Sequence, residues 1–363
     1  MNTSSPKRNN SDNKKDSSPL MHFGKQQVQH WVVYFSLGII TAILLSVFSI
    51  LSTSFHITPK TSGTAVKLLK KPVSVVEKHG TTESLITKLK QYGLWKIRST
   101  QEVPRYFIES YPDDIHTVEE IAIKKRLFLH ALLPHALFVR QDALQKRGSL
   151  ESILSKIACS LEDINFDTGL GYESQCAWSD FLSEDEVSFI QKLCRQYRTT
   201  TAVGLLERVD GVPTSIILAQ GALESSWGSS RFVLEGNNVF GMWTWKTKGI
   251  IPTRRDEGKT HKVKVYENIL DSVRAYHLTL NRLVFYDEFR QLRRNSDDPL
   301  ILAEGLTPYS ARGKEYVEEI KNIILANDLQ KYDSYRLSDP ETSGISGPET
   351  KPTASSEPAK VSL

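Results

Sequence analysis

The sequence predicts a mostly helical α+β protein with one transmembrane helix ahead of its folded part. Three observations carry this prediction. Residues 32–52 contain no charged side chain, which is typical of a membrane span. Several later segments repeat apolar residues about every 3.6 positions, as helices do. Between residues 243 and 266, glycines and a Lys-Val-Lys-Val alternation indicate one short β-hairpin.

The composition of the 363-residue chain is that of a globular protein with polar ends. Its net charge of +4 does not require a nucleic-acid partner, although it suits weak attraction to an anionic polymer. The sequence lacks zinc-type Cys/His spacing, a Gly-rich phosphate loop and a dinucleotide-binding fingerprint. We therefore expect no metal, no cofactor and no nucleic acid.

The uncharged segment 32–52 follows a polar head, residues 1–31, that we expect to be disordered on the cytoplasmic side. At about 1.5 Å per residue, the segment matches a hydrocarbon core of roughly 30 Å. A cleaved signal peptide and a buried globular helix are the alternatives. The apolar run is long for a signal peptide and no clear Ala-x-Ala site follows it, so we expect an uncleaved anchor.

Beyond the anchor, we expect a tether and a segment without firm assignment at 53–115, and a folded domain at 116–335. From residue 336 to 363, Pro, Ser, Thr, Gly and Glu dominate, which predicts a disordered tail. No internal repeat is found in the sequence.

Two helices of the domain have clear start signals. Thr117 is a suitable N-cap for a helix at 117–133, which Pro134 should break or kink before the pattern continues to about Gln145. A capping box at Ser183–Glu186 opens a second helix.

One carboxylic acid lies at the end of an otherwise apolar helix. Pro213 suits the first turn of this helix, and Gly228 suits its end. The residues between them are apolar on every side, so the helix belongs to the core. Glu224 falls in the last turn, where the helix dipole and burial beside Trp227 both disfavour its charged form. A carboxyl group kept protonated near neutral pH is what a general acid for glycosidic cleavage requires.

Three motifs occur together in the second half of the chain. They are Ala222–Ser230 around Glu224, the Asn-Asn-Val-Phe-Gly-Met run Asn237–Met242, and Tyr309–Ser310. Together they resemble the signature of the glucosaminidases of glycoside hydrolase family 73, in the lysozyme-like superfamily. Residues 205–215 also resemble a group of bacterial envelope proteins. The resemblance covers roughly residues 120–330 and implies a lysozyme-like domain with a small β-hairpin lobe.

The resemblance implies that Glu224 protonates the leaving oxygen of a β-1,4 bond in peptidoglycan, on the N-acetylglucosamine side. Tyr309, in preference to Tyr316, would line the cleft and orient the reacting group. Asn238 would bind the N-acetyl sugar and Phe240 would shape the floor, although the Asn-Gly content could simply build a tight loop.

Three further aromatic residues, Trp227, Trp243 and Tyr266, are candidates for substrate binding because aromatic faces suit sugar rings. Trp243 and Trp245 depart from the usual family sequence, and they could equally brace the hairpin.

The second carboxylate of a glycosidase is expected in the hairpin lobe. Between Trp243 and Tyr266 the only acids are Glu257 and Asp256, and Glu257 is the preferred candidate. A solvated turn and a reaction assisted by the substrate's own acetamido group are the alternatives.

The partner implied by these motifs is the glycan strand of peptidoglycan. The inferred substrate places the domain on the periplasmic side of a single-pass inner-membrane protein. A lytic transglycosylase and a non-catalytic glycan-binding scaffold are the alternative functions. Trp227-Gly228 favours the hydrolase, because lytic transglycosylases more often follow Glu-Ser with Phe-Asn-Pro, and an intact Glu224 argues against the scaffold.

The chain has three cysteines. In an oxidising compartment we expect Cys159 and Cys176 to pair, which leaves Cys194 as a buried helix thiol. We expect Glu207 and Asp210, which precede Pro213, to have structural roles.

Overall fold

The computed structural model describes residues 76–97, 102–167, 176–245, 248–252, 258 and 260–338. These residues belong to one compact unit, Val66–Leu363. The predicted transmembrane segment 32–52 and the head 1–31 lie outside the described residues. None of the helices in the described ranges is both long and apolar enough to cross a membrane.

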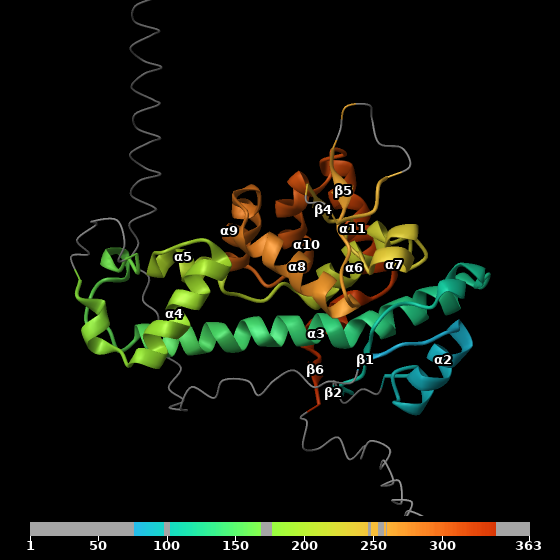
Figure 1. Ribbon diagram of the computed structural model, residues 1–363, viewed down its shortest axis with the longest axis horizontal. Coiled ribbons are helices and arrows are strands. Elements are labelled where there is room, and N and C mark those ends of the chain that lie inside the picture. Colours follow the sequence, from blue (N-terminus) through green and yellow to red (C-terminus); the bar gives the residue numbers. More distant parts are fainter. Residues whose placement is uncertain are drawn as a thin grey trace, which may run out of the picture. The chain divides into compact units, whose positions relative to one another are not determined.

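Helices account for most of the described chain (Figure 1). The α-helices are α2 (Thr82–Gln91), α3 (Ile121–Leu154), α4 (Glu184–Tyr197), α5 (Ala202–Arg208), α6 (Thr214–Glu224), α7 (Arg231–Gly236), α8 (Ile269–Arg282), α9 (Asp287–Asn295), α10 (Pro299–Leu302) and α11 (Lys314–Ala326). The 3-10 helices are η1 (Asp113–Thr117), η2 (Leu161–Asp163), η3 (Trp178–Phe181), η4 (Val284–Tyr286), η5 (Ala303–Tyr309) and η6 (Leu329–Ser334). The strands are β1 (Val76–Glu77), β2 (Glu102–Val103), β3 (Phe107–Ile108), β4 (Trp243–Thr244), β5 (Lys262–Val263) and β6 (Arg336–Leu337). The prediction of a mostly helical α+β protein is thereby confirmed.

The long helix α3 is the element against which the others pack. Helices α6 and α8 lie along one side of it, and α2 contacts it from the other side (Figure 1). Helix α6 also contacts α11 and η6, so it is enclosed on several sides. The main hydrophobic core lies between these helices.

The helix is not broken at Pro134, because α3 continues as one helix through this residue to Leu154. The start also differs: Glu120 is the N-cap, and Thr117 ends η1. Pro134 and its neighbours from Leu127 to Val139 are almost all buried. The packing of this stretch outweighs the loss of one backbone hydrogen bond at proline.

Helix α6 is a core helix, as the sequence predicts. All residues from Thr214 to Ala222 are buried. The carboxylate of Asp333 in η6 caps its first turn, accepting hydrogen bonds from the Ser215 backbone N–H at 2.9 Å and from its hydroxyl at 2.6 Å. The Asp333 carboxylate thus accepts from the Ser215 N–H, which the N-cap residue Pro213 cannot do because its side chain has no acceptor.

The predicted hairpin is present as the antiparallel pair β4 and β5. Trp243 pairs with Val263 and Thr244 with Lys262. An isolated bridge between Ile250 and Val263 extends the pairing. The strands are shorter than the Lys262–Tyr266 alternation indicates.

The segment that the sequence left unassigned contributes to the fold. It forms α2, η1 and the strands β1 to β3. Strand β1 pairs with β3, and β2 pairs with β6, both in parallel. Strand β6 lies beyond residue 335, where we expected the folded domain to end. Buried Val103 and Leu337 explain why the chain remains ordered there.

A second, smaller core joins the end of α3 to α4 and α5. This core contains the expected disulfide between Cys159 and Cys176, whereas the free Cys194 is only half-buried and not buried as expected. Burial raises the pKa of the Cys194 thiol to about 11.

The two acids before α6 have structural partners, as expected. Glu207 contacts Arg290 at 3.3 Å and Arg294 at 2.8 Å. Asp210 contacts Arg147 at 3.3 Å and Arg293 at 3.4 Å. These contacts connect the end of α5 to α3 and α9.

The cysteine pairing predicts the outcome of thiol counting. The unreduced, denatured protein should show one reactive thiol, that of Cys194, because the other two cysteines are bonded. The Cys194→Ser variant should show none. Three reactive thiols in the unreduced wild type would contradict this pairing.

Candidate active site

Glu224 is the last residue of α6, where the buried helix reaches the surface of the core. Burial raises the pKa of its carboxyl group above the ordinary glutamate value. A hydrogen bond with the Tyr316 hydroxyl and the charge of Arg312 oppose this rise, whereas Glu319 adds to it. The net direction is upward, which favours the protonated form that a general acid needs.

A tight turn follows Glu224. Ser226, Trp227 and Gly228 have consecutive positive φ angles of 51°, 59° and 82°. The Ser225 hydroxyl stabilises the turn by donating to the Gly221 carbonyl and accepting from the Gly228 N–H at 2.8 Å. Two adjacent non-glycine residues in this region are uncommon, and such strain is concentrated at functional sites.

The Asn-Asn-Val-Phe-Gly loop lies against the same carboxylate. A Cβ atom added to Gly241 would lie 3.3 Å from Glu224 Oε2, and Gly241 has a φ of +64°. The loop backbone therefore approaches the carboxylate closely because this residue has no side chain.

A chain of hydrogen bonds ends at Glu224. The Tyr276 hydroxyl donates to the Gln220 side-chain oxygen, and Gln220 Nε2 donates to the Tyr316 hydroxyl at 2.8 Å. Because Tyr316 accepts from Gln220, its own proton is available to the carboxylate of Glu224. The chain joins α8, α6 and α11.

This arrangement directs the Tyr316 hydroxyl toward the carboxyl group of Glu224. Gln220 lies one turn before Glu224 on α6 and is fully buried, so it positions Tyr316 without contacting solvent.

Tyr309 lies next to Tyr316 rather than beside the carboxylate. The two rings are stacked, with centroids 5.6 Å apart. The Tyr309 hydroxyl donates to the Phe240 carbonyl at 2.8 Å. Tyr316, which the sequence analysis ranked second, is thus the tyrosine bonded to Glu224, and Tyr309 supports the Phe240 loop.

The two loop residues expected to touch the sugar are both buried. The Asn238 side chain is 1% exposed, donates to the Met242 and Lys264 carbonyls, and accepts from the Met242 N–H. These bonds leave little capacity for a ligand, so Asn238 builds the loop. Phe240 stacks on Tyr276 with centroids 4.0 Å apart and forms part of the support beneath the site.

The two tryptophans differ in accessibility. Trp227 packs edge-on against Phe128 of α3, with Lys125 Nζ 4.8 Å from its ring centroid. Trp243 is 56% exposed and stacks on His261. Of the two, Trp243 presents the more open aromatic surface.

One predicted site residue lies elsewhere in the structure. Tyr266 lines a separate cavity that also contains Arg274 of α8. Glu257, like Asp256, lies outside the described residues. Within the described ranges, no three His, Cys, Asp or Glu side chains are grouped so that they could hold a metal ion.

Gln220 and Tyr276 were not predicted from the sequence as site residues. A signal for Gln220 exists, because it is a polar residue inside an apolar helix, four positions before the acid. Tyr276 has no comparable signal, since a tyrosine in an amphipathic helix is usual.

Comparison with known proteins identifies the segment that carries this site. Residues 201–329 match the family described as "Glucosaminidase: Mannosyl-glycoprotein endo-beta-N-acetylglucosaminidase". Residues 201–329 are therefore similar to glucosaminidase domains. The matched segment includes Gln220, Glu224, Tyr276, Tyr309 and Tyr316.

Two curated proteins are similar to the chain. Protein bax of Escherichia coli (strain K12) is 26% identical over 253 residues, which are 66% of this chain and 82% of that protein. Peptidoglycan hydrolase FlgJ of Salmonella typhimurium (strain LT2) is 33% identical over 114 residues, or 28% of this chain and only 34% of FlgJ. The resemblance to Bax-like envelope proteins is confirmed.

Among solved structures, the chain is similar to the catalytic domain of the autolysin Auto from Listeria monocytogenes. It is 20% identical and covers 39% of this chain and 80% of that chain, with a TM-score of 0.26. The lysozyme-like architecture stays a prediction.

The interaction of Tyr316 with Glu224 predicts a shift in the pH dependence of any activity that uses Glu224 as an acid. Tyr316→Phe removes a bond that lowers the Glu224 pKa, so this pKa should rise. An acid catalyst is lost as the pH rises through its pKa, and the alkaline limb of kcat/KM against pH should therefore move to higher pH.

Tyr309→Phe is the matched control, because the Tyr309 hydroxyl binds the Phe240 carbonyl instead. In this control, the alkaline limb of kcat/KM against pH should stay at the wild-type pH. An unchanged limb in Tyr316→Phe, or an equal shift in both variants, would refute the assigned role of Tyr316.

Proposed function

We propose that this protein is a peptidoglycan hydrolase that cleaves β-1,4 bonds on the N-acetylglucosamine side, with Glu224 as the general acid. One observation carries the proposal: within a segment similar to glucosaminidase domains, the last residue of a buried helix is a carboxyl group whose pKa is raised by burial. The names of the similar proteins, among them a peptidoglycan hydrolase, support the substrate.

In the proposed reaction, Glu224 donates its proton to the glycosidic oxygen as the bond to the sugar breaks. The ring then develops the positive charge of an oxocarbenium-like state. The resulting carboxylate is stabilised by the Tyr316 hydroxyl and by the charge of Arg312.

A second group must stabilise the sugar cation or activate water. Glu257 is the preferred candidate, followed by Asp256 and by the acetamido group of the substrate itself. The exposed ring of Trp243, two residues after Gly241, is available to stack on a neighbouring sugar.

We further propose that residues 32–52 anchor the protein in the inner membrane, with the domain in the periplasm. The apolar character of this segment supports the anchor. The Cys159–Cys176 disulfide supports an oxidising compartment, because such bonds persist outside the reducing cytosol.

The proposal is tested by mass spectrometry of peptidoglycan digested by the purified protein. Wild type should release products with reducing N-acetylglucosamine ends, and Glu224→Gln should retain less than a tenth of this activity. Products with anhydro ends would show that the protein is a lytic transglycosylase. Absence of cleavage by the wild type would favour the non-catalytic glycan-binding scaffold. Either result would overturn the proposal that this protein is a peptidoglycan hydrolase.

The same variant predicts a stability difference that depends on pH. The Glu224 pKa is higher in the folded than in the unfolded state, so stability falls as pH rises from the unfolded value through the folded value. Glu224→Gln lacks this loss. It should match wild type below about pH 4, and equal or exceed it at pH 7. Urea unfolding at both pH values tests this, and a less stable variant at pH 7 would contradict it.

The second carboxylate is tested with Glu257→Gln beside Asp256→Asn. If Glu257 is base or nucleophile, its variant should lose at least about 10²-fold in kcat while Asp256→Asn stays near wild type. Retained turnover in both variants would exclude both acids. A substrate without the acetyl group should then fail with the wild-type enzyme.

A further inference from the structure

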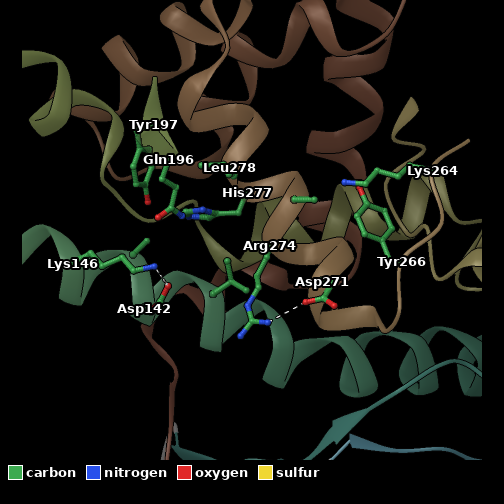
Figure 2. Close-up of a pocket in the computed structure, with 13 residues that line it drawn as sticks. Asp142, Lys146, Gln196, Tyr197, Lys264, Tyr266, Asp271, Arg274, His277 and Leu278 are labelled. Atoms are coloured by element: carbon green, nitrogen blue, oxygen red, sulfur yellow. Dashed lines mark hydrogen bonds and ion pairs between the residues drawn. The ribbon is translucent and has the colours of Figure 1, made fainter. Parts of the chain in front are cut away.

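A groove separate from the Glu224 site lies between α3 and α8 (Figure 2). Its volume is about 490 Å³, within the range of ligand-binding pockets. The C-terminal end of α4 contributes Gln196 and Tyr197 at one end, and Lys264 and Tyr266 lie at the other. We call it the α3–α8 groove.

Charges of both signs line the α3–α8 groove. Lys146 and Asp142 of α3 form an ion pair at 2.6 Å, and Arg274 and Asp271 of α8 form another at 3.1 Å. Figure 2 shows these two pairs on different walls. Lys264 adds a third cation, so the lining has an excess of positive charge.

Tyr266 supplies a polar group that the protein itself leaves unused. Its side chain is only 8% exposed, and its buried hydroxyl has no hydrogen-bond partner among the described residues. Lys264 Nζ lies 4.6 Å from the centroid of the Tyr266 ring (Figure 2). A buried hydroxyl without a partner is costly, so an acceptor from a ligand would bind here without displacing an internal bond.

The α3–α8 groove is connected to the active-site loop. The Tyr266 N–H donates to the Gly236 carbonyl at 2.9 Å, and Asn238 holds the Lys264 carbonyl at 2.7 Å. The same loop reaches Glu224 at Gly241. A ligand branch in the groove and a glycan at Glu224 would therefore contact two parts of one hydrogen-bonded segment.

We propose that the α3–α8 groove binds a short peptide bearing free carboxylates and an amine. This inference rests on the proposed function, under which the peptide is the chain that branches from the glycan strand. The Tyr266 hydroxyl and the Lys264 ammonium receive a peptide carboxylate. The carboxylates of Asp142 and Asp271 are available to the amine. Charge-assisted bonds of this kind are the strong ones in a partly buried site.

The test uses the full chain carrying Glu224→Gln, so that binding is measured without cleavage. The probe is N-acetyl-L-Ala-D-Glu-L-Lys-D-Ala, titrated by calorimetry. The Tyr266→Phe variant should bind it at least about 10-fold more weakly, the usual effect of losing a hydrogen bond to a charged group. An amidated tetra-alanine peptide should not bind.

Tyr266→Phe should fold normally, because the hydroxyl that it removes has no partner. Lys264→Met is the second variant and should weaken binding similarly. Lys331→Met, on the exposed surface of η6, is the control and should leave the affinity unchanged. Equal affinity in wild type, Tyr266→Phe and Lys264→Met would overturn the proposal, as would no binding at all.

The result can be separated from that of the hydrolase proposal. Cleavage of peptidoglycan without peptide binding would reject the groove alone. Peptide binding without cleavage would reject the hydrolase and retain the groove as a peptide site. If both hold, removal of the peptides from the glycan should raise KM for wild type and should have less effect on Tyr266→Phe.

Discussion

The burial of α6 controls the rest of the site. All residues of this helix from Thr214 to Ala222 are buried, and the helix ends at the ionisable residue Glu224. The protein caps the start of the helix with Asp333 and surrounds its end with tyrosines. Burial disfavours the charged form of the Glu224 carboxyl group and raises its pKa, which is the direction that a general acid requires.

Two different devices hold Glu224 in place. From one side, Tyr276, Gln220 and Tyr316 form a chain with one direction of donation, which fixes the proton of Tyr316 toward the carboxylate. From the other side, Gly241 lets the loop backbone approach within contact distance. Three helices and one loop thus determine the position of a single side chain, which is what preorganised catalysis requires.

The sequence predicted the parts of this arrangement that depend on local pattern. The apolar run of α6, the capping box of α4 and the hairpin were all visible as periodicity or cap chemistry. The features that depend on tertiary contacts were not predicted from the sequence. Pro134 lies within a continuous helix because the residues around it are buried. The side chain of Asn238 forms its hydrogen bonds within the loop and with Lys264. Likewise, the choice between Tyr309 and Tyr316 depends on which hydroxyl faces Glu224, and no spacing in the sequence encodes that.

The central claim is that folding raises the pKa of Glu224, and a direct titration tests it best. In the full chain labelled with ¹³C at the glutamate carboxyl carbons, the Glu224 signal is identified by its absence in Glu224→Gln. Its chemical shift followed against pH should show a midpoint above about 4.3, the value of an unperturbed glutamate. A midpoint at or below that value would mean that Glu224 is ionised near neutral pH and would contradict its role as the general acid.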